Sequence, residues 1–142
     1  MVPDEVPVIA IDGPGGSGKG VITHKLAVHL GFHILDSGAL YRVIGFAARN
    51  HSIDLDDEPA LAELARTLDV HFEPTRDPES PLRVLLEGTD VTQALRTDEA
   101  ASDASRVAPL AQVREGIGAL QHSFKQLPGL VADGRDMGTV VF

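Results

Sequence analysis

A glycine-rich stretch near the start of the sequence has the residue types that bind a polyphosphate. Gly13-Pro14-Gly15-Gly16-Ser17-Gly18-Lys19 fits the pattern G-x-x-x-x-G-K. Glycines at this spacing let backbone N–H groups curl around phosphate oxygens, while Lys19 adds a positive charge. Position 20, where many such loops carry a magnesium-binding Ser or Thr, is Gly20, and Val21 follows it. We therefore predict a phosphate-binding loop over residues 13–21.

The same stretch also matches a dinucleotide-binding pattern. Gly13, Gly15 and Gly18 satisfy G-x-G-x-x-G, and Asp36 stands at the end of the next apolar run, where such a fold places an acid. A dinucleotide loop has no need of a lysine directly after its last glycine, and it leaves the arginine-bearing motifs further along unexplained. The lysine favours the phosphate loop. A glycine-rich turn with an exposed lysine is the purely structural alternative.

Two further motifs carry charged side chains, namely Asp36-Ser37-Gly38-Ala39-Leu40-Tyr41-Arg42 and Asp133-Gly134-Arg135-Asp136. A phosphate dianion needs cations, and a guanidinium offers two parallel donors, so Arg42 and Arg135 are candidates for binding one. Asp133 ends an apolar run, where an acid can hold magnesium through water. The structural alternatives are that Ser37 or Asp36 caps a helix and that Tyr41 is a half-buried ring with its hydroxyl in water.

The elements that must position these motifs begin as β-α-β-α. An apolar run, 8–11, enters the phosphate loop, and Ile22, Leu26 and Leu30 then recur every four residues until Gly31. A strand at 32–35 leads into a helical stripe of apolar residues, which are Leu40, Val43, Ile44, Ala47 and Ala48. The later elements expected are a helix from 56–59 to Leu68, a β-hairpin of 69–73 and 83–87, helices at 97–109 and 113–124, and a strand at 130–133.

Composition narrows the classes of partner. The 142 residues are 43% hydrophobic, enough for one globular domain with a real core. A net charge of -9 argues against a protein surface that binds nucleic acid or an anionic membrane, because such partners are bound by stripes of basic residues. The sequence has no cysteine, and its six histidines lack metal-ligand spacing. We expect a cytoplasmic protein without a membrane segment.

Taken together, the phosphate loop and the motifs at 36–42 and 133–136 make the sequence resemble the bacterial cytidylate kinases, which are P-loop nucleoside monophosphate kinases. The resemblance spans nearly the whole chain, including the hairpin. It implies an α/β fold of the P-loop NTPase type, a three-layer α/β/α core with a parallel core sheet, plus an inserted NMP-binding lobe. The implied core is 1–37 and 105–142, and the lobe is 38–104 with its hairpin insert at about 69–92. The implied reaction moves the γ-phosphoryl group of ATP, with Mg²⁺, to CMP or dCMP.

The resemblance also implies roles for single residues. Residues 13–21 would hold ATP, Lys19 would bridge its phosphates, and Asp133 would bind Mg²⁺ through water. The implied CMP contacts are Ser37, Tyr41, Arg42, Ser105, Arg114, Arg135 and Asp136, with Arg42 and Arg135 on the acceptor phosphate. By composition alone Arg114 is a solvated helix residue and Ser105 carries no signal. Loops of this family usually end Gly-Lys-Gly-Thr, so Val21 removes a hydroxyl that could meet a phosphate.

The resemblance implies that chains of this family continue well beyond the position of Phe142. We expect the C-terminal part of the core and the mobile lid with its arginines to be missing from this sequence. The chain alone is then expected to bind nucleotides weakly and to turn over little or no CMP, because lid arginines supply transition-state charge. The alternative is a non-catalytic nucleotide-binding fragment. In either case the expected partners are small molecules, and the chain is expected to be a monomer.

Overall fold

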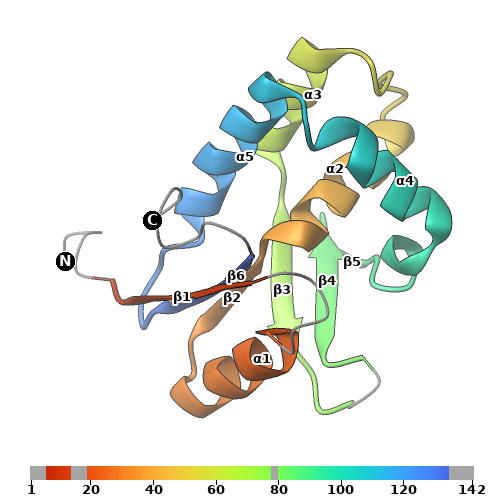
Figure 1. Ribbon diagram of the computed structural model, residues 1–142. Helices are drawn as coiled ribbons and strands as arrows, with labels where there is room; N and C mark the ends of the chain where they lie inside the picture. Colours follow the sequence, from red (N-terminus) through yellow and green to blue (C-terminus); the bar gives the residue numbers. More distant parts are fainter. Residues whose placement is uncertain (1–5, 14–18, 78–79, 135–142) are drawn as a thin grey trace. The chain divides into compact units, whose positions relative to one another are not determined.

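The computed structural model describes residues 6–13, 19–77 and 80–134 (Figure 1). The strands are β1 (Val8–Asp12), β2 (His33–Asp36), β3 (Val70–Pro74), β4 (Leu82–Leu86), β5 (Thr89–Asp90) and β6 (Leu130–Gly134). The helices are α1 (Lys19–Leu30), α2 (Ser37–Asn50), α3 (Glu58–Thr67), α4 (Asp98–Val107) and α5 (Ala111–Ser123), with a 3₁₀ turn, η2 (Ala94–Arg96). The predicted α/β succession is confirmed, and β5 is an addition to it. No helix in these ranges is long and apolar enough to span a membrane.

The chain forms two compact units. Unit 1 comprises residues 1–37, 72–83 and 121–142, and unit 2 comprises residues 38–71 and 84–120. The predicted division into a P-loop core and an NMP-binding lobe is a division by function and stays a prediction.

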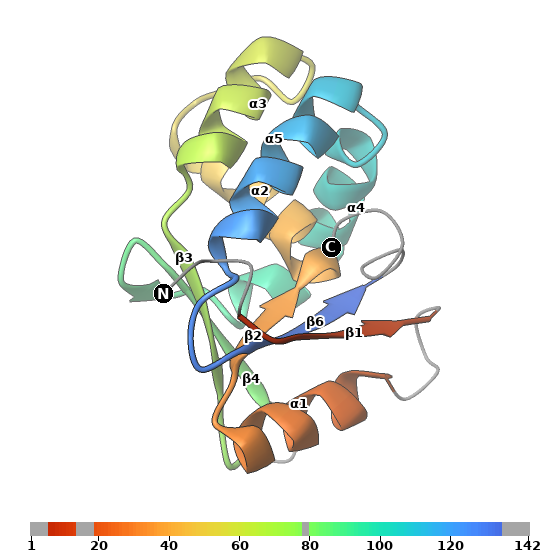
Figure 2. The same ribbon diagram turned by 90° about the vertical axis from the view of Figure 1, so that its left-hand side faces the viewer.

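Unit 1 contains a parallel sheet of three strands in the order β1-β6-β2. The central strand pairs in register on both sides, so that Val131 lies between Ile9 and Ile34. All five residues of β6 are buried, as expected for the inner strand of a parallel sheet. Helix α1 lies along one face of this sheet (Figure 2). The loop and helix between β1 and β2 therefore return the chain to the same sheet.

Helix α1 is confirmed, but its apolar stripe is not its buried face. The buried side chains are Thr23 and Ala27, one turn apart, whereas Ile22 and Leu30 are exposed. Small side chains on the buried face let a helix lie close to a sheet. This explains why Thr23 and Ala27, rather than the larger Ile22 and Leu30, face the sheet. Gly31 ends the helix with φ 67°, the left-handed cap that the sequence predicts.

Unit 2 is built mainly from helices around an apolar core. Its fully buried side chains include Leu40, Val43, Ile44, Leu61, Val107, Val113 and Ile117. Side-chain caps fix two helix starts, because Asp57 accepts from the backbone N–H of Ala60 at 3.3 Å and Thr97 from that of Ala100 at 3.1 Å. Between β4 and β5, Glu87 and Gly88 both have positive φ, the signature of a tight hairpin turn.

Candidate functional site

Two acidic residues of unit 1 lie where parallel strands end. Asp36 closes β2, Asp133 stands next to last in β6, and the two are register partners on adjacent strands. On β1 the ladder continues one step further, since the backbone N–H of Gly13 donates to the carbonyl of Gly134 at 3.2 Å. Ligands of open parallel sheets bind beyond the carboxyl ends of the strands, at the edge that these residues form.

Helix α1 begins at the same edge. Its first residue is Lys19, followed by Gly20 and Val21. The free N–H groups and the dipole of a helix N-terminus favour an anion there. Among the described residues, apart from its chain neighbours and its own helix backbone, none lies within 4 Å of the position that a Cβ on Gly20 would take. Residues 14–18 of the predicted loop and the Lys19 side chain lie outside the described residues.

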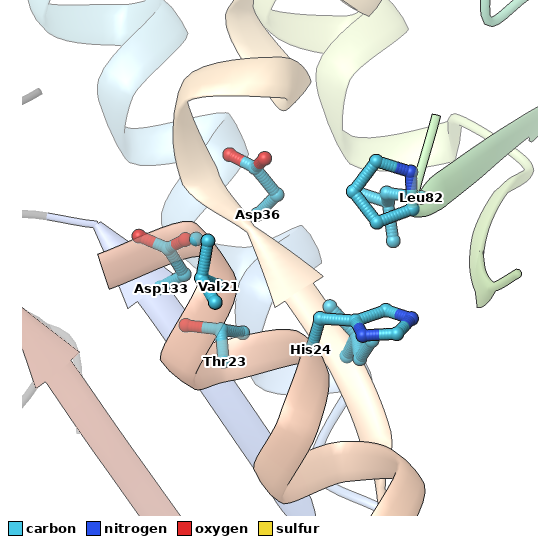
Figure 3. Close-up of a pocket in the computed structure, with 9 residues that line it drawn as sticks. Val21, Thr23, His24, Asp36, Leu82 and Asp133 are labelled. Atoms are coloured by element: carbon cyan, nitrogen blue, oxygen red, sulfur yellow. The ribbon is translucent and has the colours of Figure 1, made fainter. Parts of the chain in front are cut away.

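A pocket of about 270 Å³ lies in unit 1 against this helix start (Figure 3). It is lined by residues of α1, the ends of β2 and β6, and the start of β4, namely Gly20, Val21, Thr23, His24, Ile34, Asp36, Pro81, Leu82 and Asp133. Asp133 and Thr23 are buried polar side chains in a largely apolar wall. The arrangement joins a helix N-terminus to carboxylate oxygens, which suits a phosphate together with a cation.

The β3–β4 turn reaches the pocket through a hydrogen bond. The His24 ring Nε2 lies 2.9 Å from the carbonyl oxygen of Thr75. The Thr75 N–H in turn donates to the carbonyl of Pro81 at 2.8 Å, which closes the turn. The sequence patterns did not predict that Thr23, His24 and this turn help to form the pocket. The four-residue spacing from Lys19 to Thr23 was a signal for Thr23, but no local pattern marks the others.

The oxygen donors suit Mg²⁺, which prefers oxygen ligands and keeps several waters. Asp133 and Asp36 offer carboxylate oxygens at one sheet edge. In the described ranges, no group of three or more His, Cys, Asp or Glu residues could hold a metal ion by itself.

Unit 2 holds four residues of the predicted acceptor set. On α2, the Arg42 Nη1 group donates to the carbonyl of Leu95 at 2.7 Å. Burial raises the pKa of the neighbouring Tyr41 hydroxyl, and the positive charge of Arg114 on α5 partly opposes that rise. The structure thus brings Tyr41 and Arg114 within electrostatic reach of each other. Ser105 is exposed on α4, and its hydroxyl donates to the carbonyl of Ala101 at 3.1 Å.

The remaining predicted residues divide between the described and undescribed parts. Ser37, the first residue of α2, is buried. Arg135 and Asp136 lie outside the described residues. The roles of all these side chains stay predictions.

Comparison with known proteins gives a consistent match. The family model described as cytidylate kinase matches residues 9–142. The chain is 56% identical over 138 residues to a cytidylate kinase of Pseudomonas syringae pv. tomato, covering 97% of this chain and 60% of that protein. It is 56% identical over 135 residues to one of Azotobacter vinelandii, covering 95% and 58%, and 53% identical over 137 residues to one of Klebsiella pneumoniae, covering 96% and 59%. The chain therefore spans about 60% of the length of these curated relatives.

Proposed function

This chain belongs to the cytidylate kinase family, and from that premise we propose that it binds ATP and CMP and transfers the γ-phosphoryl group of ATP to CMP or dCMP. One observation carries the proposal beyond family membership. Residues Gly20 and Val21 at the N-terminus of α1, together with Asp133 and Asp36, line one pocket at the carboxyl ends of a parallel sheet. That combination suits a magnesium polyphosphate.

On the donor side, residues 13–21 would surround the ATP phosphates with backbone N–H groups. Lys19 would lie between donor phosphates and neutralise charge that grows during transfer. Asp133 would hold Mg²⁺ through water, and its buried place next to last in β6 supports a fixed position for that carboxylate. Mg²⁺, when bound, would neutralise phosphate charge.

On the acceptor side, Arg42 and Arg135 would bind the CMP phosphate. Arg42 already has its guanidinium oriented by one hydrogen bond, to the carbonyl of Leu95, which leaves other N–H donors for a ligand. The nucleoside contacts in this proposal are Ser37, Tyr41, Ser105, Arg114 and Asp136. Asp136 would accept from the cytosine amino group, since an exocyclic amine is a donor and a carboxylate is an acceptor.

In the proposed reaction an oxygen of the CMP phosphate attacks the γ-phosphorus of ATP. The new P–O bond forms while the bond to the β,γ-bridging oxygen breaks, so the products are CDP and ADP. The attacking oxygen is already ionised at neutral pH, so no general base is needed. The work of the protein is then alignment and charge neutralisation.

The proposal includes a finer architecture than the two units by themselves. Residues 1–37 and 105–142 would act as the P-loop core, and residues 38–104 as the NMP-binding lobe that carries the hairpin. We further propose that the chain acts as a monomer in the cytoplasm on small molecules. Because the chain spans about 60% of its curated relatives, nucleotide binding and turnover are separate questions for it. The alternative is that the chain binds nucleotides without transferring a phosphoryl group.

Calorimetric titration with ATP, CMP, dCMP, UMP and AMP, beside a coupled kinase assay, tests the proposal. We expect CMP and dCMP to bind more tightly than UMP and AMP. Asp136→Ala should weaken CMP far more than ATP, whereas Asp56→Ala, which removes an exposed carboxylate, should change neither. The proposal would be refuted if the chain bound neither ATP nor CMP. Equal losses of CMP and ATP in Asp136→Ala would show that Asp136 acts on folding rather than on the base.

A further inference from the structure

Helices α2 and α4 are joined by an ion pair that the proposed reaction does not use directly. The Arg49 guanidinium donates to both carboxylate oxygens of Asp103, from Nε to Oδ2 at 2.5 Å and from Nη2 to Oδ1 at 2.9 Å. The Asp103 side chain is only 5% exposed, while Arg49 is 49% exposed. A fork of two parallel bonds fixes direction as well as distance. The pair therefore sets how α4 lies on α2.

The backbones of the two helices also approach closely at this point. Gly45 lies one turn before Arg49 on α2, and a Cβ placed on Gly45 would stand 2.8 Å from the Cβ of Asp103. Atoms of real side chains are essentially never that close, so this approach needs a glycine. The ion pair and the close approach at Gly45 together fix the position of α4 against α2.

A second contact lies on the same face of α2. Arg42 precedes Arg49 by seven residues, which is two helical turns, and donates to the carbonyl of Leu95 at 2.7 Å. Leu95 belongs to η2, which leads through the Thr97 cap into α4. Helix α2 thus holds residues 94–107, here called the 94–107 segment, at two points: Arg42 at its start and Arg49 further on.

From this arrangement we infer that Arg49 and Asp103 are positioning residues for the acceptor nucleotide, because their ion pair seats the 94–107 segment that orients Arg42 and carries Ser105. The direction of the Arg42 guanidinium depends on where the Leu95 carbonyl lies. That carbonyl depends on the seat of α4, and Ser105 follows Asp103 by two residues on the same helix. The acceptor role of Arg42 and Ser105 rests on the proposed function, whereas the mechanical link does not.

Two variants of the pair and one matched control test the inference. Asp103→Asn removes the charge of the buried partner, and Arg49→Lys keeps a charge but loses the fork. The control is Asp56→Asn, because Asp56 accepts from Arg106, also on α4, at 2.8 Å through an exposed pair. All three variants alter an ion pair of α4, but only the first two alter an ion pair between α4 and α2.

The first measurement needs no ligand. In ¹⁵N NMR spectra of the whole chain, the Arg42 Nε–Hε signal should shift and exchange faster with water in Asp103→Asn and Arg49→Lys, and stay as in the wild type in Asp56→Asn. The second measurement is calorimetry with CMP and with ATP. The dissociation constant for CMP should rise about tenfold in both pair variants, since a small misplacement of binding groups has effects of at least this size. For ATP the change should stay below about twofold.

The two measurements separate the inference from the proposed function. An unchanged Arg42 signal in both pair variants would overturn the inference, as would losses of CMP and ATP affinity that are equal. If the wild-type chain binds no CMP, the proposed function fails, and the Arg42 signal still decides whether the ion pair positions that guanidinium.

Discussion

Replacing Val21 with threonine should strengthen the binding of ATP. Val21 is the third residue of α1, 58% exposed, and lines the pocket that also contains Asp133 (Figure 3). Threonine has nearly the shape of valine but carries a hydroxyl in place of one methyl group. At the N-terminus of a helix next to the proposed phosphate site, that hydroxyl can donate to a phosphate oxygen.

The expected gain follows from the exposure of the position. A hydrogen bond to a charged group contributes about 1.5–3 kcal/mol when well formed. A hydroxyl that stays more than half in water gives up bonds to water, so we expect about 1 kcal/mol, or roughly fivefold in the dissociation constant. The free energy of unfolding should change by less than about 0.5 kcal/mol, because valine and threonine have similar helix propensities and the methyl group is poorly buried.

Calorimetry with ATP and Mg²⁺ measures the effect, and Val28→Thr is the matched control. Val28 lies on the same helix with 57% of its surface exposed, but outside the residues that line the pocket. Its replacement should leave ATP affinity unchanged. The reasoning is refuted if Val21→Thr binds ATP no more tightly than the wild type, or if Val28→Thr gives the same gain.

Three other predictions concern packing, pH and the metal. Gly116→Ala should lower the free energy of unfolding by about 1–2 kcal/mol in urea titrations, because a Cβ there would lie 2.7 Å from the carbonyl oxygen of Ala62 and this clash would outweigh the gain in helix propensity. Gly118→Ala, whose Cβ would meet none of the described residues within 4 Å, should raise it by about 0.5–1 kcal/mol. Hydrogen bonding from Arg49 lowers the pKa of Asp103 below its ordinary value of 3.8, so the stability from this pair is present above about pH 4 and lost as the pH falls through the lowered pKa. Thermal unfolding on both sides of pH 4 should show a smaller acid loss in Asp103→Asn than in the wild type, and an equal loss would contradict the assignment. We expect Mg²⁺ to raise the ATP affinity of the wild type. Asp133→Asn should abolish that gain, while exposed Asp69→Asn should retain it.

Much of the fold could be predicted because its signals are local. The Asp57-Glu58-Pro59 start of α3 and the Gly31 end of α1 depend on capping chemistry within a few residues, and both lie where the sequence places them. Strand β5 was not predicted because it has two residues and depends on positive φ at Glu87 and Gly88, and a Glu-Gly pair is a weak turn signal. The buried face of α1 was also hidden, since apolar residues surround that helix and only packing selects one face.

The candidate site was predictable in its motifs but not in its surroundings. Residue spacing predicts the phosphate loop, and the preceding apolar run predicts a role for Asp133; the structure places Gly20, Val21 and Asp133 around one pocket. The contact between His24 and the carbonyl of Thr75 joins residues 51 positions apart, and no sequence period reports such a contact. The same holds for Arg49 and Asp103, 54 positions apart, which by composition are two ordinary surface charges.

The strand order β1-β6-β2 has a consequence for how the protein is made. Strands β1 and β2 do not pair with each other, because β6 lies between them. Strand β6 begins only at Leu130. During synthesis the first two strands leave the ribosome early and wait for a central partner that arrives much later. Sheets closed by such distant segments fold slowly. Until then the unpaired backbone N–H and C=O groups of β1 and β2 are open to wrong partners, so the yield of folded protein should depend on how fast the ribosome completes β6 and on the chaperones present meanwhile.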